Sequence, residues 1–312
     1  MIALNERIEG GITGLLIGDA LGVPYEFHLK QDIPPASEIE FTPPPGFQRS
    51  HSSVLPGTWS DDGAHALVLL ASLLHCSRLD LDDLGRRLLD WYTSGYKAVD
   101  NVVFDVGVQT SQSLVRLQSG IPPGEAGPSD ERANGNGSLM RVLPLAIWHK
   151  GTDEELVADA HNQSVITHGH IRSQVCCALY CLWARYTMAG LPDSWPRAVA
   201  SLRTIYGDDS RRRHELEWSI RPDDPPEGDG TGYVVDCLRS ARWAMEAGNY
   251  QDVVRAAISL GRDTDTTACV AGGIAGLRDG IKAIPQGWKD GLRGKALFQT
   301  ELAALINWRS VR

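Results

Sequence analysis

The chain has 312 residues, of which 42% are hydrophobic and 22% are charged, and its formal net charge is −9. This length is enough to bury a substantial core, and the composition is typical of a soluble globular protein. The acidic balance argues against a nucleic-acid backbone as the main partner, because phosphates bind to basic stripes. The short basic run at residues 211–213 is better interpreted as a solvated helix face.

The first predicted element is a helix over residues 8–21. Its glycines recur every three to four residues and so line one face, where a second helix backbone can approach closely: Gly11, Gly14 and Gly18. Gly22 and Pro24 end this helix. Asp19, near the helix end, has either a structural or a functional role.

Glu26 follows in a loop, between Tyr25 and Phe27. Aromatic neighbours favour a partly buried carboxylate with a raised pKa. Residues 30–56 hold many of the prolines and little periodicity, so we expect an irregular excursion that could cover a site.

The next feature is an oxygen-rich cluster in which a hydroxyl stands beside two carboxylates: Ser60, Asp61 and Asp62. It precedes an apolar run that predicts a helix over residues 64–74. Further helices are predicted over residues 81–92, 104–117, 142–149, 154–163, 171–188, 232–247 and 250–260, and a surface loop over residues 120–128.

Two segments in the middle of the chain could contact a ligand. Residues 135–141, GNGSLMR, form a glycine-rich turn before a predicted helix, and such turns can bind anions through backbone N–H groups. A plain turn is the simpler interpretation, since neither Rossmann spacing nor a Walker lysine is present. His168 and His170 flank Gly169 at the head of another helix, where they are better placed for a ligand than a lone core histidine.

The polar cluster at residues 262–267, RDTDTT, opens a long run of small and apolar residues that predicts a buried helix. One Asp and one Thr could simply cap this helix. Two carboxylates at the mouth of a buried helix would repel each other unless a cation lies between them. The donors are all oxygens, which suit Mg²⁺, Mn²⁺ or Ca²⁺ better than zinc. Two oxygen-rich helix starts in one chain favour a shared pair of cations over two independent caps.

The six cysteines are typical of small buried hydrophobic residues in a reducing compartment, because none has metal-ligand spacing. Residues 1–7 and the glycine-interrupted segment after them fit neither a signal peptide nor a membrane span. We therefore expect a cytoplasmic protein without a membrane partner. Alternating apolar runs are almost absent, so we expect a compact all-α fold, with residues 1–312 as one domain and a monomer.

Several segments together resemble the ADP-ribosylglycohydrolase family, most closely its dinitrogenase-reductase-activating type. They occur in the family's order: GLLIGDALGVPYEF (14–27), GTWSDDGAHALVL (57–69), GNGSLMRVLP (135–144), ITHGH (166–170), GYVVDCL (232–238), LGRDTDTTACVAGGIAGL (260–277) and IPQGW (284–288). The resemblance implies an orthogonal helical bundle with two divalent cations, Mg²⁺ or Mn²⁺. It also implies hydrolysis of the bond between ADP-ribose and a protein side chain, typically arginine.

The resemblance implies roles for individual residues as well. The metal ligands would be Ser60, Asp61, Asp62, Asp263, Asp265 and Thr266. The groups closest to the chemistry would be Glu26, Asp61 and Asp265. ADP-ribose would contact Asn136, Gly137, Ser138, His168 and Tyr233. Cleavage of a serine, nucleobase or small-molecule linkage, and a non-catalytic ADP-ribose-binding role, are the alternatives.

The chain departs from the family pattern at two positions. Gly63 stands where Thr is common, and Arg262 stands where Gly is common. Neither change removes a ligand. We expect Arg262 to turn aside and pair with a nearby acid, since an unpaired cation beside two metal ions would be costly.

Overall fold

The structure is a computed structural model that describes residues 2–310. Within these residues it contains helices and turns but no β-strand, and one isolated β-bridge joins Gly135 to Tyr233. The predicted all-α fold is therefore confirmed.

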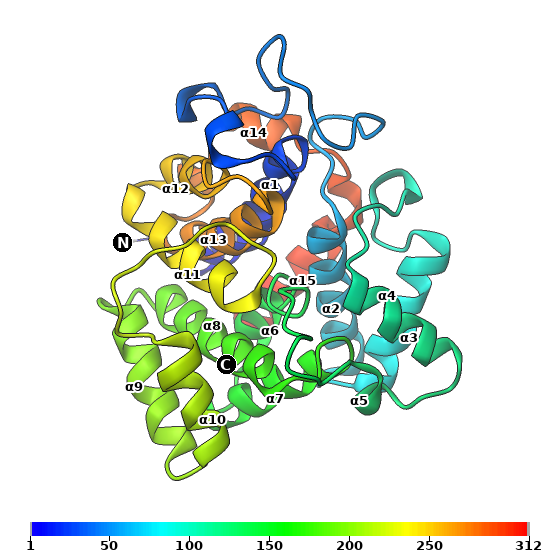
Figure 1. The fold of residues 1–312 in the computed structure, drawn as a ribbon, viewed down its shortest axis with the longest axis vertical. Helices are drawn as coiled ribbons and strands as arrows, with labels where there is room; N and C mark the ends of the chain where they lie inside the picture. Colours follow the sequence, from blue (N-terminus) through cyan, green and yellow to red (C-terminus); the bar gives the residue numbers. More distant parts are fainter. Residues whose placement is uncertain (1, 311–312) are drawn as a thin grey trace.

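Fifteen α-helices follow one another along the described part of the chain (Figure 1). Their bounds are α1 (Leu4–Gly22), α2 (Asp61–Cys76), α3 (Leu81–Ser94), α4 (Val108–Gln118), α5 (Pro123–Ala126), α6 (Leu143–Trp148), α7 (Asp153–Val165), α8 (Ile171–Met188), α9 (Ser194–Tyr206), α10 (Ser210–His214), α11 (Val234–Ala244), α12 (Tyr250–Ile258), α13 (Thr264–Asp279), α14 (Gln286–Gly291) and α15 (Gln299–Ser310). The predicted helix over residues 171–188 is α8 residue for residue. The irregular excursion over residues 30–56 is also confirmed, since it contains only two 3₁₀ turns.

Two sequence-based expectations were wrong in detail. The helix expected from residue 104 begins only at Val108, because Asp105 has a φ of 56° and cannot continue a right-handed helix. The surface loop over residues 120–128 contains the short helix α5, which buries Ala126. The structure also shows α9, α14 and α15, whose segments were not singled out as helices.

Helices α1 and α13 lie side by side through the middle of the molecule (Figure 1) and touch through their backbones. A Cβ atom on Gly18 would lie 2.1 Å from the carbonyl oxygen of Ala268, and one on Gly276 would lie 2.0 Å from that of Gly10. The predicted small-residue face of the first helix is therefore confirmed. Its partner is α13, which is buried from Thr264 to Leu277.

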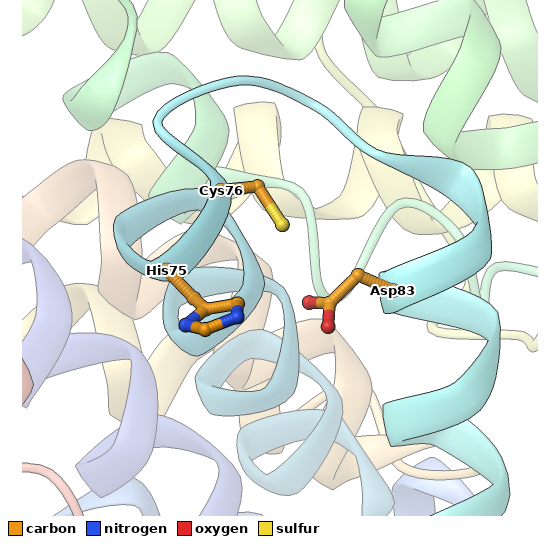
Figure 2. Close-up of side chains that lie close together, drawn as sticks. All are labelled: His75, Cys76 and Asp83. Carbon is orange, nitrogen blue, oxygen red and sulfur yellow. The ribbon is translucent and has the colours of Figure 1, made fainter.

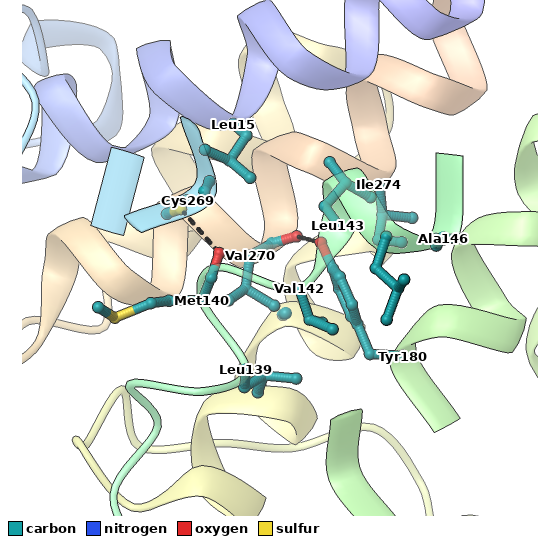
Figure 3. Close-up of a cluster of buried hydrophobic side chains, with 14 of the residues drawn as sticks. Leu15, Leu139, Met140, Val142, Leu143, Ala146, Tyr180, Cys269, Val270 and Ile274 are labelled. Atoms are coloured by element: carbon teal, nitrogen blue, oxygen red, sulfur yellow. Dashed lines mark hydrogen bonds between the residues drawn. The ribbon is translucent and has the colours of Figure 1, made fainter. Parts of the chain in front are cut away.

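The other face of α13 packs into the core formed with α6 and α8 (Figure 3). The Tyr180 hydroxyl donates to the carbonyl of Val270 at 2.9 Å, and the Cys269 thiol donates to the carbonyl of Met140 at 3.7 Å. These bonds tie α13 to α8 and to the turn before α6, so α13 is held on both sides.

This packing brings three helix ends together. The Thr264 hydroxyl at the start of α13 donates to the carbonyl of Gly22 at the end of α1, at 2.8 Å. Asp19 of α1 accepts the backbone N–H groups of Ser60 and Gly63, at 2.8 and 2.7 Å, and so fixes the start of α2. Both oxygen-rich helix starts therefore meet near Asp19, which has a structural role at the start of α2.

The backbone contact between α1 and α13 predicts that Gly18→Ala has a lower free energy of unfolding than the wild type. The added methyl group would overlap the Ala268 carbonyl, and overpacking of this kind costs about 1–3 kcal/mol. Gly287→Ala in α14 is the matched control, because a Cβ there meets nothing within 4 Å. Urea titration should show a lower midpoint for Gly18→Ala and an unchanged or higher one for Gly287→Ala. Equal midpoints for both variants would contradict the close approach.

Candidate metal centre and substrate cleft

A cleft opens where the ends of α1, α2 and α13 meet the segment before α4 and the turn before α6. Its lining combines carboxylates with backbone of glycine-rich loops. The lining residues are Glu26, Asp61, Asp62, Asp105, Gly107, Val108, Gln109, Thr110, Gly135, Asn136, Gly137, Met140, His168, Gly232, Asp263 and Thr266.

The starts of α2 and α13 contact each other through hydroxyl groups. Ser60 caps α2 and donates to Asp62 Oδ2 at 3.1 Å. Thr266 in the first turn of α13 donates to the same oxygen at 3.4 Å. Glu26, Asp263 and Asp265 offer carboxylate oxygens that all lie within 4.8 Å of one another. The fold thus brings together all six residues for which the resemblance implied a metal-binding role.

The carboxylates of this cluster are buried together, and this opposes their ionisation. Burial, with the neighbouring carboxylates, raises the pKa of Asp61, Asp62 and Asp265 well above the usual value. Among residues 2–310 no lysine or arginine forms an ion pair with any of the three. The cluster is therefore a concentrated region of like charge without a protein counter-charge.

Two oxygens of this cluster also have no hydrogen-bond partner within the described residues. They are Asp62 Oδ1 and Asp265 Oδ2, and both are buried. Unpartnered buried polar atoms are costly, and in native proteins they usually bind an ion or water. The donor set is made only of carboxylate and hydroxyl oxygens, so the residues fit hard divalent cations such as Mg²⁺ or Mn²⁺.

Glu26 lies at one side of this cluster, and only 4% of it is exposed. Burial, followed by the charges of Asp105, Asp263 and Asp62, raises its pKa to about 10. Its Oε2 atom lies 2.6 Å from Nε2 of His51, a residue of the irregular excursion. The expectation of a buried Glu26 with a raised pKa agrees with the structure.

Asp105 is a cleft carboxylate that sequence reasoning missed. It comes from the non-helical segment before α4, where its left-handed backbone turns it toward the other acids. Burial and the charge of Asp263 raise its pKa to about 6, although a hydrogen bond with Asp265 acts in the opposite direction. The sequence signal was an isolated Asp two residues before Gly107, which resembles an ordinary helix start.

On the far side of the cleft, the glycine-rich turn approaches other parts of the chain closely. The Asn136 amide donates to Asp263 Oδ2 at 2.9 Å, which joins the turn to the acidic cluster. A Cβ atom on Gly137 would lie 2.8 Å from Cε1 of His168, so glycine is required there. His168 is 2% exposed, and burial lowers its pKa to about 3, so that its ring is neutral.

The two remaining residues predicted to contact ADP-ribose lie elsewhere. The Ser138 hydroxyl is fully buried and accepts from Ser164 at 2.8 Å, outside the cleft lining. Tyr233 is 40% exposed and lines a separate hollow, while its chain neighbour Gly232 lines the cleft. The structure thus brings Asn136, Gly137 and His168 into the cleft and places Tyr233 next to it.

The two departures from the family pattern have physical explanations. A Cβ atom on Gly63 would lie 2.8 Å from Cδ2 of Leu16, so a side chain there would push the start of α2 away from α1. The Arg262 guanidinium turns away from the acidic cluster and donates to the carbonyl of Asp229 at 2.5 Å. It also lies 3.9 Å from the Asp229 carboxylate, so the expected pairing with an acid is observed.

A second group of possible metal ligands lies at the turn between α2 and α3 (Figure 2). It consists of His75, Cys76 and Asp83, which the sequence analysis did not single out. Asp83 is already bound by Arg86 and Arg87, each at 2.6 Å. Burial acts to raise the pKa of Asp83, but these bonds outweigh it and lower the pKa. Because the only carboxylate of the group is neutralised, we assign no metal to it.

Comparisons with known proteins point in one direction. The family model described as ADP-ribosylglycohydrolase matches residues 1–311. ADP-ribosylarginine hydrolase Tri1 of Serratia proteamaculans (strain 568) is 29% identical over 297 residues, which cover 92% of this chain and 75% of the relative. ADP-ribosyl-(dinitrogen reductase) glycohydrolase of Rhodospirillum rubrum is 26% identical over 288 residues, which cover 92% of this chain and 90% of the relative.

The fold gives the same result. The solved structure of an ADP-ribosylglycohydrolase-related protein complex matches with a TM-score of 0.77 and 30% sequence identity, covering 99% of each chain. Across residues 2–310, every helix is too short or too polar to cross a lipid bilayer.

The buried acidic cluster predicts how stability depends on pH. Asp105, Asp19 and Glu26 have folded-state pKa values of about 6, 7 and 10, above the value of about 4 in an unfolded chain. The folded state therefore binds these protons more tightly, and stability is lost as pH rises from about 4 through the folded values. In chelator, the melting temperature should fall between pH 5 and pH 8.

Added Mn²⁺ or Mg²⁺ should raise the melting temperature more at pH 8 than at pH 5, because a cation competes with protons for the same oxygens. Asp62→Asn removes one of the like charges, so it should melt higher than the wild type in chelator at pH 8 and gain less from the cation. Differential scanning fluorimetry measures the melting temperature of both proteins in chelator and with each cation. A cation-induced gain that is independent of pH and retained in Asp62→Asn would argue against this site.

Proposed function

The chain belongs to the ADP-ribosylglycohydrolase family and is a hydrolase of glycosidic bonds, and from this premise we propose that it releases ADP-ribose from arginine side chains of modified proteins. The observation that carries the proposal is the buried group of carboxylates with two unpartnered oxygens beside Glu26. Similarity to proteins described as an ADP-ribosylarginine hydrolase and as an ADP-ribosyl-(dinitrogen reductase) glycohydrolase supports the arginine linkage.

We propose that two divalent cations, Mg²⁺ or Mn²⁺, bind at this cluster. The residues that would hold them are Ser60, Asp61, Asp62, Asp263, Asp265 and Thr266. Bound cations would supply Lewis acidity and lower the pKa of a nearby water molecule. The buried carboxylates would then be stable in their ionised form, since a positive charge would offset their mutual repulsion.

The chain's own residues supply the remaining chemistry. We assign to Asp61, which lines the cleft, and to Asp265 beside it the stabilisation of positive charge that develops on the ribose ring as its bond to the leaving group breaks. Glu26 is held by His51 and faces the same carboxylates, so we assign it the proton transfer between water and the leaving group. Asp105 has a lower pKa than Glu26, and we assign it as the second proton acceptor within the cleft.

The other side of the cleft would bind ADP-ribose. Asn136 and Gly137 line the cleft at the glycine-rich turn, and His168 offers a neutral ring beside them. Tyr233 is exposed next to this turn, where its ring can stack on adenine. Ser138, which is buried behind the turn, would hold the turn in place through its bond with Ser164.

The preference for arginine follows from charge. The chain carries 39 acidic and 30 basic residues, so its field attracts a cationic guanidinium better than a neutral serine or base linkage. Arg262 does not oppose this, since its guanidinium turns toward Asp229. We propose further that residues 1–312 act as one domain, as a monomer and in the cytoplasm, which agrees with six free cysteines.

The linkage prediction is tested with a panel of substrates joined through arginine, serine and nucleobase. The arginine-linked substrate should give the highest kcat/KM, and rising salt should lower that value because screening weakens attraction of the cation. Excess EDTA should abolish turnover, and Mn²⁺ or Mg²⁺ should restore it. A tenfold preference for another linkage would overturn the arginine assignment, and full turnover in chelator would overturn the cation assignment.

The role of Glu26 is tested with Glu26→Gln, which keeps the shape of the side chain and its bond with His51 but cannot transfer a proton. We expect kcat to fall by about 100-fold or more, because general acid–base catalysis contributes about 10²–10⁴-fold. The Kd for free ADP-ribose, measured by calorimetry, should stay within a few-fold of the wild-type value. An unchanged kcat would reduce Glu26 to a structural carboxylate.

A further inference from the structure

Three aromatic rings form a row beside Glu26, which lines the cleft. The ring centroids of Phe27 and His51 lie 5.6 Å apart, and those of His51 and Phe104 lie 5.1 Å apart. We call these three side chains the aromatic row. They come from three separate segments, the loop after α1, the irregular excursion and the segment before α4, so the tertiary fold brings them together.

The backbone at the outer end of the row adopts an unfavourable conformation. Phe27 has a φ of 64°, in the left-handed region that bulky residues rarely adopt. It is held there by two backbone bonds of 2.6 Å, from its own N–H to the Arg262 carbonyl and from the Arg262 N–H to the His28 carbonyl. His51 also has a left-handed backbone, with a φ of 50°.

The Phe27 ring does not offset this strain by burial, because Phe27 is 69% exposed. Glycine would fit the same backbone with less strain and would expose less apolar surface. Strained residues that are not required by packing concentrate at binding and catalytic sites. The exposed ring therefore points to a ligand contact rather than to a role in the core.

Carboxylates lie directly against the row. His51 Nε2 is 2.6 Å from Glu26 Oε2, and Glu26, His51 and Asp105 each offer an atom within 4.8 Å of the other two. The rings are tilted to one another by 49° and 56°, so each offers its own face. An exposed ring face next to carboxylate oxygens suits a flat cation that can stack on it and donate hydrogen bonds at the same time. Guanidinium has this chemistry, because it is planar, weakly hydrated and rich in N–H donors.

We propose that the aromatic row, together with the carboxylates of Glu26 and Asp105, is the subsite for the guanidinium and stem of the modified arginine. This inference rests on the proposed arginine linkage and goes further, because it assigns the residues that recognise the leaving group. A serine-linked substrate has no planar cation to stack on the row, so the row adds to the linkage specificity that the acidic charge of the chain provides.

The test uses Phe27→Leu, which removes the aromatic face and keeps an apolar side chain, and Phe27→Tyr, which keeps the face. Trp218→Leu is the control, since Trp218 is a 73% exposed aromatic residue whose ring lies against His214 and not against the aromatic row. With ADP-ribosyl-arginine, Phe27→Leu should raise KM about tenfold at unchanged kcat, as expected when cation–π binding is lost. Phe27→Tyr should stay within about threefold of the wild type, and Trp218→Leu should match it.

Binding of free ADP-ribose, which lacks the leaving group, separates this subsite from the rest of the cleft. Its Kd should change less than about twofold in Phe27→Leu, and thermal melting of each variant verifies folding. Two results would overturn the subsite alone. One is equal kinetics for Phe27→Leu and Trp218→Leu, and the other is a rise in the Kd for free ADP-ribose in Phe27→Leu as large as the rise in KM for the arginine substrate. A wild-type enzyme that leaves the arginine-linked substrate uncleaved overturns both the subsite and the arginine proposal.

Discussion

The backbone contact between α1 and α13 positions the two acidic helix starts of the cleft. Glycine and alanine at the contact bring the two helices so close that a methyl group on Gly18 would overlap a carbonyl of α13. Because α1 carries Asp19, the same helix also fixes the start of α2 through two backbone bonds. A shift of α1 would therefore move both acidic helix starts, and small residues are needed at positions that never touch a substrate.

The convergence of helix starts buries several carboxylates together, and their mutual repulsion is not offset by a basic side chain within residues 2–310. Asp61, Asp62 and Asp265 are buried beside Glu26, and no basic side chain in the described residues pairs with the three aspartates. Helix N-termini and hydroxyl caps stabilise these charges only partly. The proposed cations would supply the missing counter-charge, so the same repulsion that costs stability would favour binding of a metal.

Two kinds of segment surround the cleft, helix starts and irregular loops, and they contribute different residues. Helix starts from the core hold the acidic cluster, whereas loops supply His51, Phe104 and the glycine-rich turn. Left-handed backbone at Phe27, His51, Asp105 and Arg262 gathers around the opening of the site. Irregular segments can present side chains in directions that a helix cannot, which explains why the residues proposed to recognise the leaving group come from loops.

The sequence by itself determined the all-α class, most helix positions and the two oxygen-rich helix starts, because helical periodicity and capping are local properties that a short stretch of residues expresses. It also indicated that Glu26 would be buried. The tertiary structure alone decided which carboxylates meet, that Asp105 joins them and that three rings lie in a row beside Glu26. Asp105 was missed because its left-handed backbone depends on contacts with distant segments, and Arg262 could be placed only once the position of Asp229 was known.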